Sequence, residues 1–496
     1  MAGRRKCLKP KLHVFLAAMI LGLPSLAWCR VGGSETPPSA RASAAILPDR
    51  LSQYSDLAIE WERKYLQIDT TNPPGNEIRA AEFFKRIFEQ EGIENQLFEY
   101  APGRADLWAR IPRTTAEAQK PIILLNHMDV VTSDPAQWKQ PPFSGAVVDG
   151  SIYGRGAQDM KSEGLAYLMT MILLKREKVA LNRDVIFLAV SDEEVNDSGT
   201  DWFLAQHREL LDGAGFLINE GGENLLERGG RVKYIGVDVG EKAPFWLHVV
   251  ARGHAGHGSR PRADSAPNHL VRALDRITDY RPPFKVLPVV DEFLRQMAAS
   301  EPPERAKQFR NIKAALKDRD FQIEIERDES LNYLLRDTIA VTMLGGSAQT
   351  NVIPAEAWAN LDVRLLPGED PNAFLEMLRR VVADPQVTIS PQYDRFLPAN
   401  YSSTDSQLYR AIEHVAGQYF PGAPVAPMLM SGYTESQRFR PLGIVAYGFC
   451  PYTETEEEGS TEHGNDERIR VEEVRRGFRV LYDVLMEVAG AIQKPN

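Results

Sequence analysis

The sequence predicts an α/β fold: a mainly parallel central sheet with helices on both faces, interrupted by an inserted ferredoxin-like α+β domain. Short apolar runs such as "PIILLNHMD" and "DVIFLAVSDEE" alternate with stretches of helical period such as "SEGLAYLMTMILLKRE". This alternation is typical of a parallel sheet covered by helices. After about Lys242 the order becomes strand, helix, two strands, helix, strand, which is ferredoxin-like. The first pattern resumes from about Arg395.

In the first pattern, the hydrophobic periodicity of each segment predicts whether it is a helix or a strand. Helical period predicts helices, and short apolar runs predict strands. The expected helices are 50–68, 78–92, 162–177, 200–211 and 470–492, and the expected strands are 121–129, 184–194, 214–222 and 441–449. The inserted pattern predicts strands at 244–253, 338–346, 355–368 and 385–393, with helices at 266–277 and 371–382. A polar stretch, Pro283 to Arg336, is expected to be helical.

Length and charge limit the classes of function. A chain of 496 residues predicts about two or three domains. Its hydrophobic content of 43% and charged content of 25% are ordinary for a soluble globular protein. The net charge of -10 argues against nucleic acid or an anionic membrane as the main partner. A Walker-type phosphate loop and a G-x-G-x-x-G after a strand are both missing from the sequence.

The first residues form a separate segment. Basic "MAGRRKCLKPK" precedes apolar "VFLAAMILGLPSLAWC", which is short for a membrane span of about 20 residues and is interrupted by Pro24. We interpret residues 1–29 as a signal peptide cleaved near Ala27, followed by a linker at 30–48. The expected location is secreted or periplasmic, without a stable membrane span after cleavage. An uncleaved N-terminal anchor is the alternative.

The cysteines are too few for a disulfide framework. Cys7 and Cys29 lie in the predicted signal peptide, which leaves Cys450 in the body of the chain. Any metal site must therefore use His, Asp and Glu side chains.

Several such side chains fall where strands or loops end. In open α/β sheets, functional groups gather past the carboxyl ends of the strands. The candidates are His127, Asp129, Asp159, Glu193, Glu194, Glu220 and His463. Taken singly, a histidine there is more often structural, an aspartate in a Gly-rich loop is often a cap, and a Glu-Glu pair is often solvated. Together they predict a cation site, because clustered carboxylates are costly without one and zinc accepts these ligands.

Seven motifs stand in the same order as in one enzyme family. They are "NHMDVV", "PPFSGAVVDGSIYGRGAQDMKSEG", "SDEEVND", "INEGG", "GHAGHGSRP", "TNVIPAEAWANLDVRLLPG" and "HGNDERI". Over about residues 50–490 the chain resembles the zinc-dependent metallopeptidase family of aminoacylase-1, carboxypeptidase S, glutamate carboxypeptidase and succinyl-diaminopimelate desuccinylase. The stretch around Trp138 and the long helical insertion look most like the carboxypeptidase S branch.

The resemblance implies a zinc-exopeptidase-like fold and a role for each candidate. His127 and Glu220 would bind one zinc ion, Glu194 and His463 the other, and Asp159 both. Asp129 would orient His127, Glu193 would be the general base, and His257 would reach a neighbouring active site in a homodimer. Asn351, Arg364 and Arg440 would bind substrate. Co²⁺ or Mn²⁺ would suit the same ligands.

The resemblance also implies a domain plan. Residues 49–242 and 395–496 would form the catalytic domain, and 243–394 the inserted lid and dimerisation domain. Two departures from the family pattern stand out. Met160 follows Asp159 where an acid is often found, and Gln437 occupies the place of a usual arginine, so that Arg438 or Arg440 would replace it.

The predicted function is a di-zinc hydrolase that cleaves the amide bond of a small substrate, either a dipeptide or an N-acyl amino acid. Metal-activated water would attack, with a glutamate as general base. Exopeptidase and aminoacylase look alike at this level. The alternatives are a catalytically inactive metal-binding homologue that acts as a binding protein, or a hydrolase of an ester or ureido bond.

Overall fold

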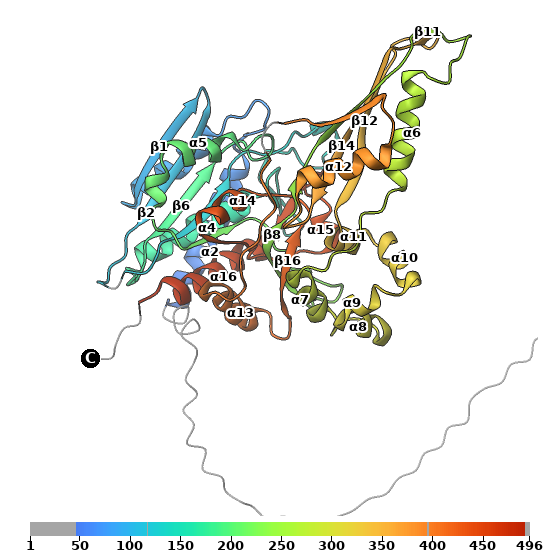
Figure 1. Ribbon diagram of the computed structural model, residues 1–496. Coiled ribbons are helices and arrows are strands. Elements are labelled where there is room, and N and C mark those ends of the chain that lie inside the picture. Colours follow the sequence, from blue (N-terminus) through green and yellow to red (C-terminus); the bar gives the residue numbers. More distant parts are fainter. Residues whose placement is uncertain (1–45, 117, 394–395, 492–496) are drawn as a thin grey trace, which may run out of the picture. The chain divides into compact units, whose positions relative to one another are not determined.

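The computed structural model describes residues 46–116, 118–393 and 396–491. The predicted signal peptide, residues 1–29, and most of the predicted linker lie outside the described residues. Within the described part of the chain, no helix has both the length and the apolar character needed to cross a membrane. The predicted α/β fold class is confirmed (Figure 1).

An eight-stranded sheet forms the larger half of the fold. In spatial order its strands are β1 (Glu94–Ala101), β2 (Arg104–Ile111), β6 (Val185–Val190), β3 (Ile122–His127), β7 (Phe216–Asn219), β17 (Val445–Gly448), β8 (Ile235–Glu241) and β16 (Val425–Met430). Strands β6, β3, β7 and β17 pair in parallel, as do β8 and β16. The β1–β2, β2–β6 and β17–β8 pairs are antiparallel, so the sheet is mixed around a parallel centre.

The central strands are buried on both faces. Ile122 and Leu124 of β3 pack into one hydrophobic core, whereas Ile123 and Leu125 pack into another on the opposite face. Side chains alternate along a strand, so a strand covered on both sides must be apolar at every position. This explains the unbroken run "IILL".

Helices cover both faces of the large sheet. One face carries α2 (Pro48–Leu66), α3 (Ile78–Gln90), α4 (Lys161–Arg176), α13 (Gln407–Tyr419) and α16 (Val471–Ala489). The opposite face carries α5 (Ser198–Gln206), η2 (Arg208–Leu211), α14 (Ser436–Phe439) and η3 (Arg440–Leu442). All sixteen residues of α4 except the last two are buried, because the helix lies between the sheet and helices α2 and α16.

A second sheet has the ferredoxin-like strand order β15–β10–β14–β12, with β9 added beside β14. Its elements are β9 (Ala243–Pro244), β10 (Leu247–Arg252), α6 (Ala266–Asp279), β12 (Thr338–Gly345), β14 (Glu356–Leu365), α12 (Pro371–Val382) and β15 (Val387–Pro391). Leu247, Val249 and Ala251 of β10 face the core with α6 and α12; α6 packs on β10 and β14, and α12 packs on α6 and β15 (Figure 1). A short pair, β11 (Gly256–His257) and β13 (Val352–Ile353), projects beyond this sheet.

The polar stretch from Pro283 to Arg336 is helical, as predicted. It contains α7 (Pro288–Met297), α8 (Pro303–Arg310), α9 (Ile312–Ala315), α10 (Arg319–Arg327) and α11 (Glu329–Leu335). Its buried side chains, such as Leu294 and Phe309, join the core of the large sheet, and α7 packs on β16. The predicted domain boundaries stay a prediction.

The remaining short elements surround the ends of the large sheet. They are η1 (Pro135–Gln137), β4 (Ala146–Val148), β5 (Ser151–Tyr153), α15 (Glu456–Gly459) and β18 (Arg468–Arg470). Strands β18, β5 and β4 form a three-stranded antiparallel sheet, which joins the loop before α4 to the loop before α16.

Candidate metal centre

Two histidines converge on one aspartate past the carboxyl end of β3. His127 Nε2 lies 2.8 Å from Asp159 Oδ1 and 3.3 Å from Glu220 Oε2. On the other side, His463 Nε2 lies 2.9 Å from Asp159 Oδ2 and 3.2 Å from Glu194 Oε2. The structure thus brings together all five predicted ligands, with one Asp159 oxygen facing each histidine.

The charges of this cluster suit divalent cations. Burial lowers the pKa of His127, but the charge of Glu220 and a hydrogen bond with Asp159 outweigh it and hold that pKa well above its usual value. Hydrogen bonds with Asp159 and Glu194 raise the pKa of His463 to about 11. Burial raises the pKa values of Glu194 and Glu220. Glu194 Oε1 is buried without a hydrogen-bond partner among the described residues. Cations between these groups would satisfy the carboxylates and both Nε2 atoms.

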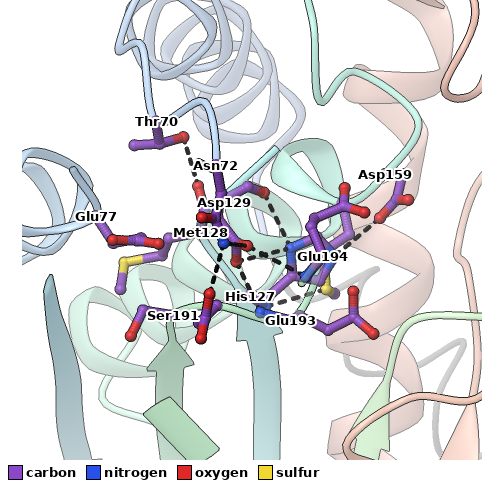
Figure 2. A network of polar contacts seen from close by, with 12 residues as sticks. Thr70, Asn72, Glu77, His127, Met128, Asp129, Asp159, Ser191, Glu193 and Glu194 are labelled. Atoms are coloured by element: carbon purple, nitrogen blue, oxygen red, sulfur yellow. Dashed lines mark hydrogen bonds and ion pairs between the residues drawn. The ribbon is translucent and has the colours of Figure 1, made fainter. Parts of the chain in front are cut away.

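Asp129 fixes the position of His127 and of the Glu193–Glu194 turn. The His127 Nδ1 atom lies 3.0 Å from the Asp129 backbone oxygen, an arrangement that places the hydrogen on Nδ1 and leaves Nε2 for a metal. The Asp129 carboxylate accepts the backbone N–H groups of Glu193 at 3.1 Å and Glu194 at 3.2 Å. Asn72 donates to the same carboxylate at 2.9 Å (Figure 2). The buried Asp129 therefore holds the end of β3, which carries His127, next to the turn that carries Glu193 and Glu194.

Glu467 holds the loop that carries Asp159. Its carboxylate accepts backbone N–H groups from Gly156 at 3.0 Å, Gln158 at 2.7 Å and Asp159 at 3.2 Å. It also pairs with Arg155 at 2.6 Å. Glu467 lies four positions after His463 in "HGNDERI", so one short segment provides a histidine and fastens the opposite loop. The Asp159–Met160 peptide bond is cis.

Glu193 lies beside the first cluster. One of its carboxylate oxygens falls within 4.8 Å of ligand atoms of His127 and Glu220. Burial, followed by the charge of Glu220, raises the pKa of Glu193 well above its usual value. Glu193 therefore lies with His127 and Glu220, whereas its neighbour Glu194 lies with His463. Figure 2 shows His127, Glu193 and Glu194 close together at the end of the strand.

His257 and Asn351 do not join this cluster within one chain. His257 is exposed on β11, and its Nδ1 atom lies 2.7 Å from the Ser259 hydroxyl. The Asn351 backbone oxygen accepts the N–H of Gly258 at 2.7 Å, so both residues belong to the projecting β11–β13 pair.

The three arginines considered for substrate binding have different surroundings. Arg440 is buried, and it pairs with Glu241 at 2.9 Å and donates to the Ala446 oxygen at 3.2 Å. Arg364 on β14 is partly exposed and pairs with Asp362 at 2.8 Å. Arg438 pairs with Asp197 at 2.6 Å and lines a cavity. The structure brings neither Arg364 nor Arg440 into direct contact with the metal ligands.

Two cavities flank the centre. One has a volume of about 260 Å³, and its polar lining consists of Asn196, Asp201, Gln437 and Arg438; its apolar and aromatic lining consists of Val195, Pro244, Trp246, Tyr393, Leu397 and Tyr433. The other has a volume of about 230 Å³ and includes Asp159, Glu163 and Glu220. The apolar cavity thus begins next to the Glu193–Glu194 turn, at Val195.

Sequence reasoning missed several residues of this site. Asn72 and Glu467 hold ligand loops, and Glu462 forms a third possible ligand group with Asp159 and His463. Glu435 is fully buried, and Asn219 donates to it at 2.9 Å. Glu467 falls inside the motif "HGNDERI" and Glu462 directly precedes it, so the signal of both was their spacing from His463, whereas Glu435 lies outside the seven motifs.

Comparison with known proteins agrees with this geometry. The model of Peptidase family M20/M25/M40 matches residues 123–487. The chain is 28% identical over 381 residues to "Probable carboxypeptidase S-like 2" of Dictyostelium discoideum, covering 74% of this chain and 72% of that protein. It is 27% identical over 442 residues to human aminoacylase-1, covering 88% of this chain and 96% of that protein.

A solved structure shares the fold. The M20 family metallo-carboxypeptidase Sso-CP2 from Sulfolobus solfataricus superposes with a TM-score of 0.64 at 20% identity, covering 86% of this chain and 98% of that one. The family match spans most of the chain and includes all five clustered candidates. The chain therefore belongs to Peptidase family M20/M25/M40 and is a hydrolase of the metallopeptidase and aminoacylase type.

Proposed function

We propose that this protein is a di-zinc hydrolase that cleaves the amide bond of small substrates, either N-acyl amino acids or dipeptides. The observation that carries the proposal is the pair of histidine–carboxylate clusters that share Asp159, with Glu193 beside them. His127 and Glu220 would hold one ion, Glu194 and His463 the other, and Asp159 would bridge them. When bound, the two ions would act as Lewis acids on the attacking water and on the substrate carbonyl.

The protein's own part in the reaction is proton transfer and positioning. The Glu193 carboxylate accepts a proton from the attacking water and delivers it to the leaving nitrogen, because it lies within 4.8 Å of ligand atoms of His127 and Glu220. The Asp129 carboxylate holds the Glu193 backbone N–H at 3.1 Å and so limits where this base can move.

The cavities support a small substrate with an apolar group. A cavity of about 260 Å³ is at the small end of ligand pockets, which excludes a folded protein. Its walls include Trp246 and Tyr433, and its edge carries the Arg438 guanidinium. An acyl or side-chain hydrocarbon would pack against these rings, and the Arg438 guanidinium beside them is held by Asp197 at 2.6 Å and Asp201 at 2.9 Å. Aminoacylase-1 and carboxypeptidase S-like relatives fit the two substrate types in this proposal.

The small sheet supports a homodimer that supplies His257 to a neighbouring site. Its edge strand β12 exposes Met343 by 53% and Leu344 by 66%, and Val352 of β13 is exposed by 42%. An exposed edge with large apolar side chains is a surface suited to pairing with a second copy. The basic and apolar N-terminal segment supports export to a secreted or periplasmic location.

Replacement of Glu193 by glutamine tests the mechanism. Glu193→Gln keeps the size of the side chain but removes the base, so turnover should fall about 10²- to 10⁴-fold while two metal ions per chain remain. The measurement is hydrolysis of a panel of N-acyl amino acids and dipeptides, with metal analysis of the same sample. Glu209→Gln, on the surface element η2, is the matched control. Normal turnover in Glu193→Gln would reject the mechanism.

The same panel separates the alternatives. Cleavage of esters or ureido compounds in preference to amides would change the bond but keep the site. Zinc-loaded protein that binds these compounds without hydrolysing any of them would indicate a catalytically inactive binding protein.

A further inference from the structure

A third cavity, separate from the metal centre, lies where the helical segment α7–α11 begins and ends. Its volume is about 560 Å³. Residues 281–286 before α7 form one wall, helices α9 and α10 another, and Arg336 after α11 a third. None of the predicted metal ligands lines it.

The lining of this cavity is strongly basic. It contains Arg281, Lys313, Arg319 and Arg336, against a single acid, Glu326. Within the described ranges, no carboxylate pairs with Arg281, Lys313 or Arg319; Arg319 instead donates to the Gln322 side chain at 3.0 Å. Four cations against one acid leave an excess of three positive charges in the lining, with Arg281, Lys313 and Arg319 exposed to solvent, and an anion would neutralise this excess.

Arg336 is buried in the wall rather than extended into solvent. Only 4% of it is exposed, and its guanidinium carbon lies 3.6 Å from the centre of the Phe284 ring. Its Nη2 atom lies 3.3 Å from Glu326, whereas its buried Nε atom has no partner among the described residues. Burial, and then the charges of Arg281 and Arg319, lower the pKa of Arg336 despite Glu326. A buried guanidinium with a free donor beside two like charges is unfavourable without a ligand.

The backbone around Arg336 is held in place. The Lys285 N–H donates to the Leu335 oxygen at 2.7 Å, which ties the entrance of the helical segment to its exit. The buried Lys242 ammonium donates to the Arg336 backbone oxygen at 2.9 Å. The guanidinium is therefore presented by a fixed segment, and binding there would require little reordering.

We propose that this cavity binds a phosphate-bearing ligand, with Arg336, Arg319, Arg281 and Lys313 around the phosphate. A guanidinium presents a planar fork of donors that matches phosphate oxygens, and several positive charges favour a multiply charged anion over chloride or a single carboxylate. The volume exceeds that of phosphate alone, and Phe284, Val286 and Leu316 offer apolar surface to the rest of the ligand.

Calorimetric titration of the full-length, metal-loaded protein with inorganic phosphate tests this site, at constant ionic strength in chloride. Wild-type protein is expected to bind, and Arg319→Gln to bind about tenfold more weakly, as for loss of one charge-assisted hydrogen bond. Arg327→Gln is the matched control, because Arg327 lies on the same helix α10 outside the cavity lining. Arg336→Lys keeps the charge but loses the fork, and should also weaken binding.

Phosphate can also bind metal ions, so the titration is repeated in an Asp159→Asn background. Binding that persists there and weakens with Arg319→Gln supports the cavity. Binding that vanishes in Asp159→Asn and is unchanged in Arg319→Gln belongs to the metal centre and overturns the proposal, as does an absence of binding. Sedimentation with phosphatidylglycerol vesicles, compared with phosphatidylcholine vesicles, separates a lipid headgroup from a soluble phosphate ester as the source.

Discussion

The two sheets present their candidate functional groups in opposite ways. At the end of the large sheet, His127 and Asp129 are fully buried, and each ligand loop is held by a further carboxylate or amide. At the β11–β13 pair, which projects beyond the small sheet, His257 and Asn351 are exposed, and the His257 ring contacts Ser259 of the loop that follows β11. The first region assembles its candidate groups within a single chain, whereas the second leaves its candidate groups exposed at the surface.

Because the two regions differ in burial, mutations in each region should change different measured properties. Changes in the buried cluster should alter metal content and stability, because metal binding is coupled to the geometry of its ligands. Changes at the exposed β11–β13 pair should alter turnover and leave the metals in place. The following predictions test that division, beginning with the largest effect.

Asp159→Asn should have the largest effect. Asp159 gives one oxygen to each histidine cluster, so its loss should release both ions. Turnover should fall at least about 10³-fold, because metal ions contribute several kcal/mol of transition-state stabilisation. Metal analysis and the hydrolysis assay measure both quantities, and Asp134→Asn, on an exposed residue, is the control. Retention of two ions by Asp159→Asn would show that the bridging role is wrong.

His257→Ala should affect turnover alone. If His257 stabilises the oxyanion of a neighbouring site, its removal should lower kcat about 10²- to 10³-fold without loss of metal. His254→Ala, three residues earlier on the same exposed loop, is the matched control.

Mixed dimers make this test sharper. A His257→Ala chain paired with a Glu193→Gln chain contains one site that has both groups, provided that His257 acts across the dimer. An equal mixture should therefore regain about a quarter of wild-type activity. A mixture as inactive as its components would mean that His257 does not act in a partner's site.

Glu467→Gln should have an intermediate effect on metal affinity. It keeps the side-chain shape but removes the charge that faces Arg155 and accepts three backbone N–H groups of the Asp159 loop. Loss of such an outer contact lowers metal affinity about 10- to 100-fold. Competition with a chelator measures this affinity, and Glu472→Gln at the start of α16 is the control. Unchanged affinity would indicate that the loop holds its shape without this carboxylate.

The sequence predicted the buried region better than the contacts that support it. The strand expected at 121–129 is β3, and the helix expected at 162–177 is α4, because unbroken apolar runs between turns specify elements buried on every side. The five candidate ligands stood out because each ends a strand or lies in a Gly-rich or terminal loop, but their assignment as metal ligands came from the family resemblance and stays a prediction.

Other contacts could not be predicted from the sequence. Asn72 meets Asp129, and Glu467 meets the Asp159 loop, across separations of 57 and 308 residues, which no local pattern encodes. The packing of α7 on β16 was also missed, because an amphipathic helix shows that it has a partner without showing which. The antiparallel edges of the large sheet were hidden for the same reason: periodicity predicts a strand but not its neighbour.

The smallest predicted effect concerns the connection between the two regions. Lys242 lies between β8 of the large sheet and β9 of the small one, and it is fully buried. Its ammonium donates to the Arg336 oxygen at 2.9 Å, the Thr338 hydroxyl at 3.1 Å and the Tyr333 oxygen at 3.2 Å. Burial lowers the pKa of Lys242 to about 7, although the charge of Asp337 opposes this change.

Because the folded-state pKa lies below the unfolded value of about 10.4, the unfolded chain binds more protons between these two values. The Lys242 contribution to the free energy of unfolding should therefore increase with pH in that window, by about 1 kcal/mol between pH 7 and pH 8. Lys242→Met lacks this contribution, so urea unfolding at the two pH values should show a smaller gain for the variant than for the wild type. Equal gains would mean that Lys242 stays charged between pH 7 and pH 8. The ammonium between β8 and β9 would then be hydrated rather than buried.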